Sequence, residues 1–242
     1  MVGTQEAPGI MVLTLRDMFT TINGDKDRDY EVKVSYVEIY NEVIHDLLIP
    51  NSKDTYLELR DDPIKGVTLA GVIENRVDDS KHVMNLLLQG NKRRTTEATN
   101  ANQTSSRSHA VFQISVASKE KTKGTNMEVL CGKLSLIDLA GSERGSVTEN
   151  RGIRLMEGAK INRSLLSLAN CINALGDKTK KGVFVPYRDS KLTRMLKDSL
   201  GGNCKTVMIT TISPANSQYE ETVNSLKYAS RAKVKQDIIN RI

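Results

Sequence analysis

The stretch from Val129 to Asp138 ends in a nearly continuous apolar run, interrupted only by Ser135, and closes on a carboxylate. Its length and composition predict a β-strand rather than a helix. A hydrophobic strand that ends in Asp can present its carboxylate to a magnesium ion at the mouth of a parallel sheet. The sequence therefore predicts an α/β fold with Asp138 at a functional edge, although this residue could instead cap the turn that begins at Leu139.

Four further segments are assigned from local composition. Tyr30 to Tyr40 is dense in Val, Ile and Tyr, and His109 to Ser118 places its apolar side chains on one face, so both are predicted strands. Thr206 to Ile212 is a β-branched run typical of a buried strand, which Ser213-Pro214 would end. The segment from Tyr40 to Leu48 is predicted to be a short helix or turn.

Helical signals are strongest in the second half of the chain. Apolar residues from Ile161 to Leu175 recur at alternating steps of four and three, which places them on one stripe of a helix ended by Gly176. Ser80 is expected to cap a helix that runs through Leu88. The remaining predicted helices are Ile10 to Phe19, Asp189 to Leu200 and Tyr219 to Lys235.

The composition limits the kinds of protein this chain can be. With 242 residues and 38% hydrophobic content it fits one domain with a sizeable core. Aromatic residues are only 4%, so platforms for stacking single-stranded nucleic acid are scarce. Three cysteines without metal-ligand spacing argue against a disulfide framework or a zinc site and fit a reducing cytosol. We expect a soluble chain with no membrane-spanning segment.

The positive charge is concentrated in the later half of the chain. The formal net charge is +6, but Arg144 to Lys235 alone contains 17 Lys and Arg against 7 Asp and Glu. A basic surface of this kind fits an acidic partner, and either nucleic acid or an acidic protein lattice would serve. An ordinary solvated face is the simpler alternative.

Two motifs point to a specific family. Asn102 to His109 reads Asn-Gln-Thr-Ser-Ser-Arg-Ser-His, and Asp138 to Glu143 reads Asp-Leu-Ala-Gly-Ser-Glu. Both resemble the nucleotide-sensing switches of kinesin motor domains. Further stretches follow in the order seen in kinesins and extend the resemblance over essentially the whole chain: Glu157–Leu165, Val185–Arg194, Asp198–Asn203 and Leu226–Lys233. Asn150 to Gly152 together with Leu168 to Leu175 is similar to the kinesin-8 class, whose members regulate microtubule length.

The resemblance implies a three-layer, P-loop NTPase-like sandwich with a mixed central sheet. Yet the 242 residues contain no Gly-x-x-x-x-Gly-Lys-Ser/Thr loop, which normally cradles the β- and γ-phosphates. Met1 to Thr4 resembles the stretch that follows that loop in kinesins. The chain is therefore expected to begin just past the loop, to have an incomplete sheet and to be inactive alone. Residues 1–235 would belong to the motor domain and 236–242 to the start of the neck.

The resemblance also assigns roles in binding ATP and Mg²⁺. Asn102, Ser105, Ser106 and Gly141 would contact the nucleotide, and Asp138 would serve magnesium through water together with Ser106. Arg107 and Glu143 would close the site as an ion pair, with Asn162 in the water network. Read without the family, the Ser-rich stretch could be a polar loop, Gly141 a turn residue and the Arg–Glu pair a weak exposed contact. His109 is interpreted as a structural residue, because no His or Cys lies at metal-ligand spacing from it.

Microtubules would be the partner of the basic half. By resemblance, the helix from Asn162 to Leu175 and the segments after it would lie against acidic tubulin. Arg188, Lys191 and Arg194 are three residues apart, so one helix face can present all three, although ordinary solvation would explain any one of them. Arg60 and Lys65 match another tubulin-contacting loop, weakened by their acidic neighbours. The full set is Arg163, Lys178, Lys180, Lys181, Arg188, Lys191 and Arg194.

Three functions follow in order of support. The first is a motor ATPase that couples ATP hydrolysis to movement on microtubules or to regulation of their length, in the cytoplasm and on the cytoskeleton, with any dimer formed through regions beyond this chain. The second is a pseudo-motor that binds microtubules without catalysis, against which the complete switches argue. The third is a basic nucleic-acid binder, which the scarce aromatics disfavour.

Overall fold

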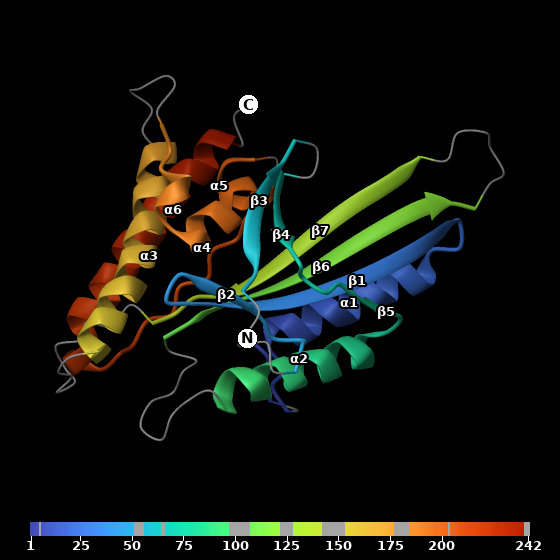
Figure 1. Ribbon diagram of the computed structural model, residues 1–242, viewed down its shortest axis with the longest axis horizontal. Coiled ribbons are helices and arrows are strands. Elements are labelled where there is room, and N and C mark those ends of the chain that lie inside the picture. Colours follow the sequence, from blue (N-terminus) through green and yellow to red (C-terminus); the bar gives the residue numbers. More distant parts are fainter. Residues whose placement is uncertain are drawn as a thin grey trace. The chain divides into compact units, whose positions relative to one another are not determined.

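The computed structural model describes residues 1–4, 6–50, 56–63, 66–96, 107–121, 128–141, 153–176, 184–202 and 204–239, with side chains left out at 95–96, 153–161 and 233–239. The chain forms two compact units. The first contains residues 1–40, 44–57 and 71–140, and the second contains residues 41–43, 58–70 and 141–242. Helices and strands occur in both units (Figure 1).

A five-stranded sheet organises the first unit. Its strands run in the order β2-β1-β6-β7, and β5 also pairs with β1. β6 pairs antiparallel with both β1 and β7, with Val34 opposite Ile114 and Phe112 opposite Leu136. The strand bounds are β1 Arg28–Tyr40, β2 Val43–Asp46, β5 Asn75–Val77, β6 His109–Glu120 and β7 Val129–Asp138.

Helices α1 (Ile10–Gly24) and α2 (Ser80–Thr96) cover one face of this sheet (Figure 1). Their apolar side chains pack against one face of β1 and β6. The central part of β1 is buried on both faces, since Val34 to Ile39 are all buried. Gly90 allows the close approach of α2, because an added Cβ there would lie 2.4 Å from the ring of Tyr36. The core consists mainly of Met11, Leu15, Phe19, Val32, Val34, Tyr36, Val83, Leu87, Phe112 and Ile114.

The second unit is mainly helical. α3 (Ile153–Gly176) packs against α6 (Tyr219–Ile239) and α4 (Lys191–Met195), and the Tyr228 hydroxyl donates a hydrogen bond to the Leu165 carbonyl. The predicted apolar stripe of α3 is buried at Leu165, Leu168 and Ile172. The other elements are the hairpin of β3 (Glu58–Asp62) and β4 (Gly66–Ala70), α5 (Lys197–Gly201) and the 3-10 turns Tyr187–Asp189 and Asn216–Gln218.

Three local predictions were wrong. The predicted helix from Asp189 to Leu200 begins only at Lys191, because Ser190 is extended and its hydroxyl accepts the amide hydrogen of Thr193 as a helix N-cap. It is then divided into α4 and α5 at Leu196, whose backbone leaves the helical conformation. Tyr40 to Leu48 contains strand β2, reached through a turn in which Asn41 and Glu42 both have positive φ. α2 is capped by Asp79 rather than Ser80, since the Asp79 carboxylate accepts the His82 amide hydrogen.

The segment from Thr206 to Ile212 is not a buried strand. It belongs to no helix or strand, and the side chains of Val207 and Ile209 are 79% and 61% exposed. A β-branched run becomes a buried strand only when neighbours pair with it and cover it. Among the described residues no strand pairs with this segment.

The environment of β7 also differs from the prediction. β7 has the predicted bounds but lies antiparallel to β6, and its first five residues are exposed. The described pairs of β1, β5, β6 and β7 are antiparallel, and they form part of the mixed sheet that the resemblance implied. Asp138 nevertheless ends the strand, opposite Ala110 at the start of β6. Among the described helices, none combines the length and apolar character that crossing a bilayer requires.

Candidate functional site

Asp138 is held by a buried arginine. In the last turn of α2, Arg94 places its Nη1 atom 2.9 Å from Oδ2 of Asp138. The same guanidinium lies 3.7 Å from the Glu38 carboxylate and donates hydrogen bonds to the hydroxyl and carbonyl of Ser108 at 3.1 and 2.8 Å. Arg94 thus ties together β1, the residue before β6 and the end of β7.

The two carboxylates around Arg94 differ in their access to water. The Glu38 side chain is 1% exposed, whereas that of Asp138 is 53% exposed. Because a buried guanidinium stays charged, the two acids compensate its desolvation. Asp138 is therefore oriented by Arg94 while its outer face can still accept hydrogen bonds from water. An oriented, hydrated carboxylate is the kind of oxygen donor that suits Mg²⁺ bound through water.

His109 fixes the backbone that follows β7. The amide of Ala140 donates a hydrogen bond of 3.0 Å to Nδ1 of His109, whose side chain is buried. Burial and, to a smaller extent, the nearby Arg94 charge lower the pKa of His109 to about 4, with Asp138 partly opposing the shift. At neutral pH the ring is uncharged, so Nδ1 accepts and Nε2 carries the proton. Gly141 is thus tethered through its neighbour.

Acidification should therefore destabilise the first unit. The pKa of His109 falls from 6.5 to about 4 on folding, so the unfolded chain takes up this proton first as the pH is lowered. The loss begins near pH 6.5 and should reach roughly 3 kcal/mol of unfolding free energy by pH 4. Urea titrations between pH 7 and 4 should show that the free energy of unfolding declines less in His109→Gln than in the parent chain. Equal declines would show that His109 is not the group responsible for the pH dependence.

A hollow of about 310 Å³ opens beside Asp138. Most of its lining is apolar, and the polar groups are the Asp138 carboxylate, Asn91 and the Tyr36 hydroxyl, which donates a 2.7 Å hydrogen bond to Asn91. Burial raises the pKa of Tyr36, so it stays protonated as a donor. The remaining lining residues are Met1, Val2, Gly3, Met11, Ala110, Phe112 and Leu136.

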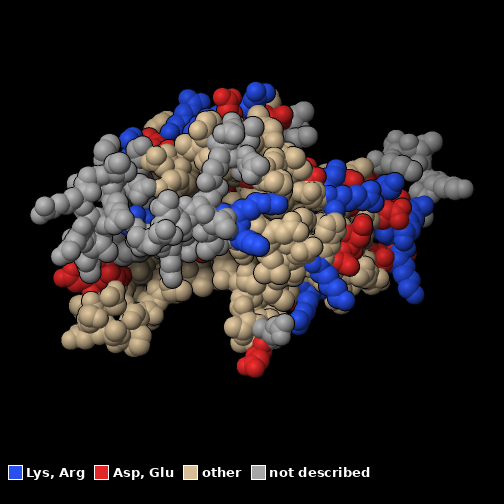
Figure 2. Space-filling view, turned by 60° about the horizontal axis from the view of Figure 1, so that its bottom comes forward, with Lys and Arg blue, Asp and Glu red and all other residues tan. Residues whose placement is uncertain are grey.

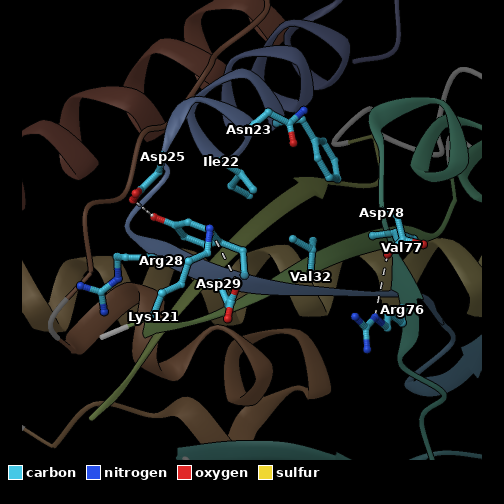
Figure 3. A pocket seen from close by; sticks show the side chains of 12 residues that line it. Ile22, Asn23, Asp25, Arg28, Asp29, Val32, Arg76, Val77, Asp78 and Lys121 are labelled. Carbon is cyan, nitrogen blue, oxygen red and sulfur yellow. Dashed lines mark hydrogen bonds and ion pairs between the residues drawn. The ribbon is translucent and has the colours of Figure 1, made fainter. Parts of the chain in front are cut away.

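A second hollow, of about 290 Å³, lies at the other end of β1 (Figure 3). There Tyr30 donates a 2.6 Å hydrogen bond to Asp25, which lowers the pKa of Asp25 and raises that of Tyr30. The molecular surface in Figure 2 shows Lys and Arg beside Asp and Glu on the right of the view. The second hollow contains none of the predicted site residues.

The structure brings together only part of the predicted site. Asp138 and Gly141 lie on the segment tethered by His109, and half-buried Arg107 precedes the Ser108 that Arg94 contacts. No cluster of three or more His, Cys, Asp or Glu that could hold a metal occurs among the described residues. Several predicted residues lie outside the described part of the chain, namely Asn102, Ser105, Ser106, Glu143, Lys178, Lys180 and Lys181.

The predicted microtubule residues of the second unit differ in their surroundings. Asn162 and Arg163 are exposed on α3, and Arg188 is exposed in the turn before α4. Lys191 is half-buried, and its backbone amide donates a 2.7 Å hydrogen bond to Glu42. Arg194 is half-buried and forms a 2.9 Å ion pair with Asp61.

Arg94 and Glu38 were not predicted. Glu38 could have been found, because it is a single acid in the apolar run from Tyr36 to Tyr40, and a carboxylate in a buried strand requires a cationic partner. The partner could not be named, since Arg94 is distant in the sequence and follows another arginine.

Comparisons with known proteins agree over nearly the whole chain. A family model for the kinesin motor domain matches residues 1–234. Kinesin-like protein KIN-8B of Arabidopsis thaliana is 56% identical over 235 residues, which are 96% of this chain and 28% of that relative. Kinesin-like protein KIF19 of Homo sapiens is 55% identical over 246 residues, which cover 99% of this chain and 24% of that relative. The chain spans about a quarter of the length of these curated relatives.

Solved structures give the same result. A KIF14[391-772] dimer with AMP-PNP in complex with a microtubule has a TM-score of 0.87 and 40% identity, covering 97% of this chain and 67% of that one. A KIF14[391-755] complex with ADP and a microtubule has a TM-score of 0.84 and 40% identity, covering 97% and 68%. These similarities confirm the predicted α/β, P-loop NTPase-like fold class.

Proposed function

We propose that this chain, which belongs to the kinesin motor-domain family and is similar to its kinesin-8 members, works in a microtubule-based motor ATPase. The observation that carries the proposal is the edge formed by Asp138, Arg94 and His109. It joins an oriented carboxylate to a tethered backbone segment ending at Gly141. Such an edge can respond to a phosphate-bound cation, because phosphoryl transfer depends mainly on positioning and electrostatics.

The nucleotide side would use the two switch motifs. Asn102, Ser105 and Ser106 would contact the phosphates of ATP, and the Gly141 amide would register the γ-phosphate. Asp138 and Ser106 would hold Mg²⁺, which when bound supplies charge neutralisation at the phosphates. Arg107 and Glu143 would close the site, and Asn162 would help order the attacking water. Arg94 would keep the Asp138 carboxylate in place, since it donates to that carboxylate directly.

The partner side would be the basic surface of the second unit. Exposed Arg163 and Arg188 support this, as does the description of the KIF14 structures as microtubule complexes. Lys178, Lys180, Lys181 and Lys191 complete the proposed set. Arg194, which the sequence analysis also assigned to it, instead pairs with Asp61 at 2.9 Å. We assign residues 1–235 to the motor domain and 236–242 to the start of the neck. The motor would act on cytoplasmic or spindle microtubules. Any dimer would form through other regions of the protein.

A microtubule-binding module without catalysis is the second candidate. It is favoured by the exposed Arg163 and Arg188 of the second unit, because a basic surface can bind an acidic partner without a nucleotide site. A domain completed with the N-terminal residues of a relative's motor domain would decide between the candidates. Microtubule-stimulated ATP turnover there would support the motor, and saturable microtubule binding without turnover would support the module.

Charge reversal tests the partner surface. Replacing both Arg188 and Lys191 with Glu should weaken microtubule binding at least about tenfold at low salt, because two attractive contacts become repulsive. The control reverses two exposed lysines of the first unit, Lys81→Glu and Lys119→Glu, which changes the net charge equally. Cosedimentation at low and moderate salt measures both. Equal binding by the two double variants would show that the assigned surface is wrong.

A further inference from the structure

Three acidic side chains join helices α4 and α5 to chain segments far away in the sequence. Glu42 accepts the Lys191 amide hydrogen at 2.7 Å across 149 residues, and Asp61 pairs with Arg194 at 2.9 Å across 133 residues. Asp198 accepts the Val67 amide hydrogen at 3.4 Å across 131 residues. All of these residues belong to the second unit. We call Glu42, Asp61 and Asp198 the acidic clamp.

The backbone around the clamp is shaped to make these contacts. Glu42 has φ of +63°, a left-handed conformation that non-glycine residues rarely adopt. Gly66 has φ of +73°, and an added Cβ would lie 2.5 Å from the Asp198 carboxylate. Such conformations persist where surrounding contacts stabilise them. The turn before β2 and the start of β4 are therefore built around the two helices.

The Arg194 side chain points toward the acidic clamp, where it contacts Asp61. Its side chain is 27% exposed, and its Nε atom is buried without a hydrogen-bond partner among the described residues. The guanidinium meets Asp61 on β3, whereas Arg188 is exposed in the turn before the same helix. The charge of Arg194 is thus partly neutralised within the protein.

We propose that Arg194 is a positioning residue that, through Asp61, orients α4 so that Arg188 and Lys191 meet the partner, and that Arg194 does not itself contact tubulin. This rests on the proposed function, because it assumes that α4 lies at the microtubule surface. Removing either member of the pair should loosen α4 and β3 and weaken binding indirectly. If Arg194 contacted tubulin directly, Asp61 would instead compete with tubulin for the Arg194 guanidinium.

The test is a double-mutant cycle in the 242-residue chain with Asp61→Ala, Arg194→Ala, both together, and the swap Asp61→Arg with Arg194→Asp. Without microtubules, hydrogen exchange should rise in peptides covering β3 and α4 in each single variant and fall back in the swap. Microtubule affinity should drop about two- to fivefold in each single variant, no further in the double, and recover in the swap. Asp61→Asn, which keeps the size of the side chain, repeats the test with less risk to folding.

Other outcomes overturn the proposal. Unchanged or tighter microtubule binding by Asp61→Asn, together with weaker binding by Arg194→Ala, would mean that Arg194 contacts tubulin directly. Unchanged hydrogen exchange in every variant would mean that the pair orients nothing. Arg188→Ala is the control, since it should weaken binding without changing exchange. If Arg188→Glu with Lys191→Glu leaves binding intact, the proposed microtubule surface fails, while hydrogen exchange still decides whether the pair positions α4.

Discussion

Replacing Arg107 with alanine is expected to lower microtubule-stimulated ATP turnover by about two to four orders of magnitude. Glu143 would lose its partner in a partly dehydrated site, and breaking a buried pair costs roughly 3–5 kcal/mol. In the proposed mechanism most of that cost falls on the closed state, because only there would Arg107 and Glu143 meet. Nucleotide affinity depends mainly on contacts with the phosphates and should change little.

The comparison that tests this uses a domain completed with the N-terminal residues of a relative's motor domain. Glu143→Ala should give a similar loss, and the double variant should be no worse than the worse single variant, as expected when two residues act as one unit. Arg76→Ala is a matched control, because Arg76 is 66% exposed and its ion pairs are 3.7 and 3.9 Å long. Near-normal turnover in either single variant, or additive losses in the double, would show that the two residues do not gate hydrolysis together.

Replacing Arg94 with alanine should lower the unfolding free energy of the first unit by about 3–5 kcal/mol. The change leaves Glu38, which is 1% exposed, without its cation, and it removes two hydrogen bonds to Ser108. Removing one member of a buried ion pair costs stability, because the low-polarity interior no longer compensates the charge that remains. Urea unfolding of the 242-residue chain at pH 7 measures the loss.

Two further variants separate the effect of losing the Arg94–Glu38 ion pair from the effect of losing side-chain packing. Arg76→Ala should cost less than about 1 kcal/mol, because its pairs are long and exposed. Arg94→Met combined with Glu38→Leu should recover much of the stability, because apolar side chains of similar size can replace a buried ion pair. A loss below about 1 kcal/mol for Arg94→Ala would mean that the guanidinium does not hold the three strands together.

The strong local signals predicted the fold well. β7 has the predicted bounds, β6 begins at the predicted His109, and α3 buries the predicted stripe. β6 and α3 carry a periodic apolar pattern and β7 a nearly continuous apolar run, so the residues of each segment favour one conformation. The turn residues gave weaker information. Ser190 begins α4 as its N-cap, because its hydroxyl accepts the Thr193 amide hydrogen, and the apolar pattern around it conceals this start.

For the candidate site, the sequence predicted the position of Asp138 at the end of a strand and the motif that contains His109. It did not predict what holds them. Arg94 lies 44 residues from Asp138 and 14 from Ser108, and nothing in the local pattern distinguishes it from Arg93. The wrong prediction of a buried strand from Thr206 to Ile212 also reflects missing information about distant contacts. Burial of such a run depends on a neighbouring strand and not on β-branched residues alone.

The sequence by itself therefore determined the family, the position of strands β6 and β7 and the buried stripe of α3, because apolar patterns and motif spacing are properties of short segments. Only the tertiary structure decided that Arg94 orients Asp138, that His109 tethers Ala140 and that Asp61 engages Arg194. Each of these contacts joins groups 31 to 133 residues apart. Such pairs form because a buried or half-buried polar group needs a partner, and folding determines which one comes within reach.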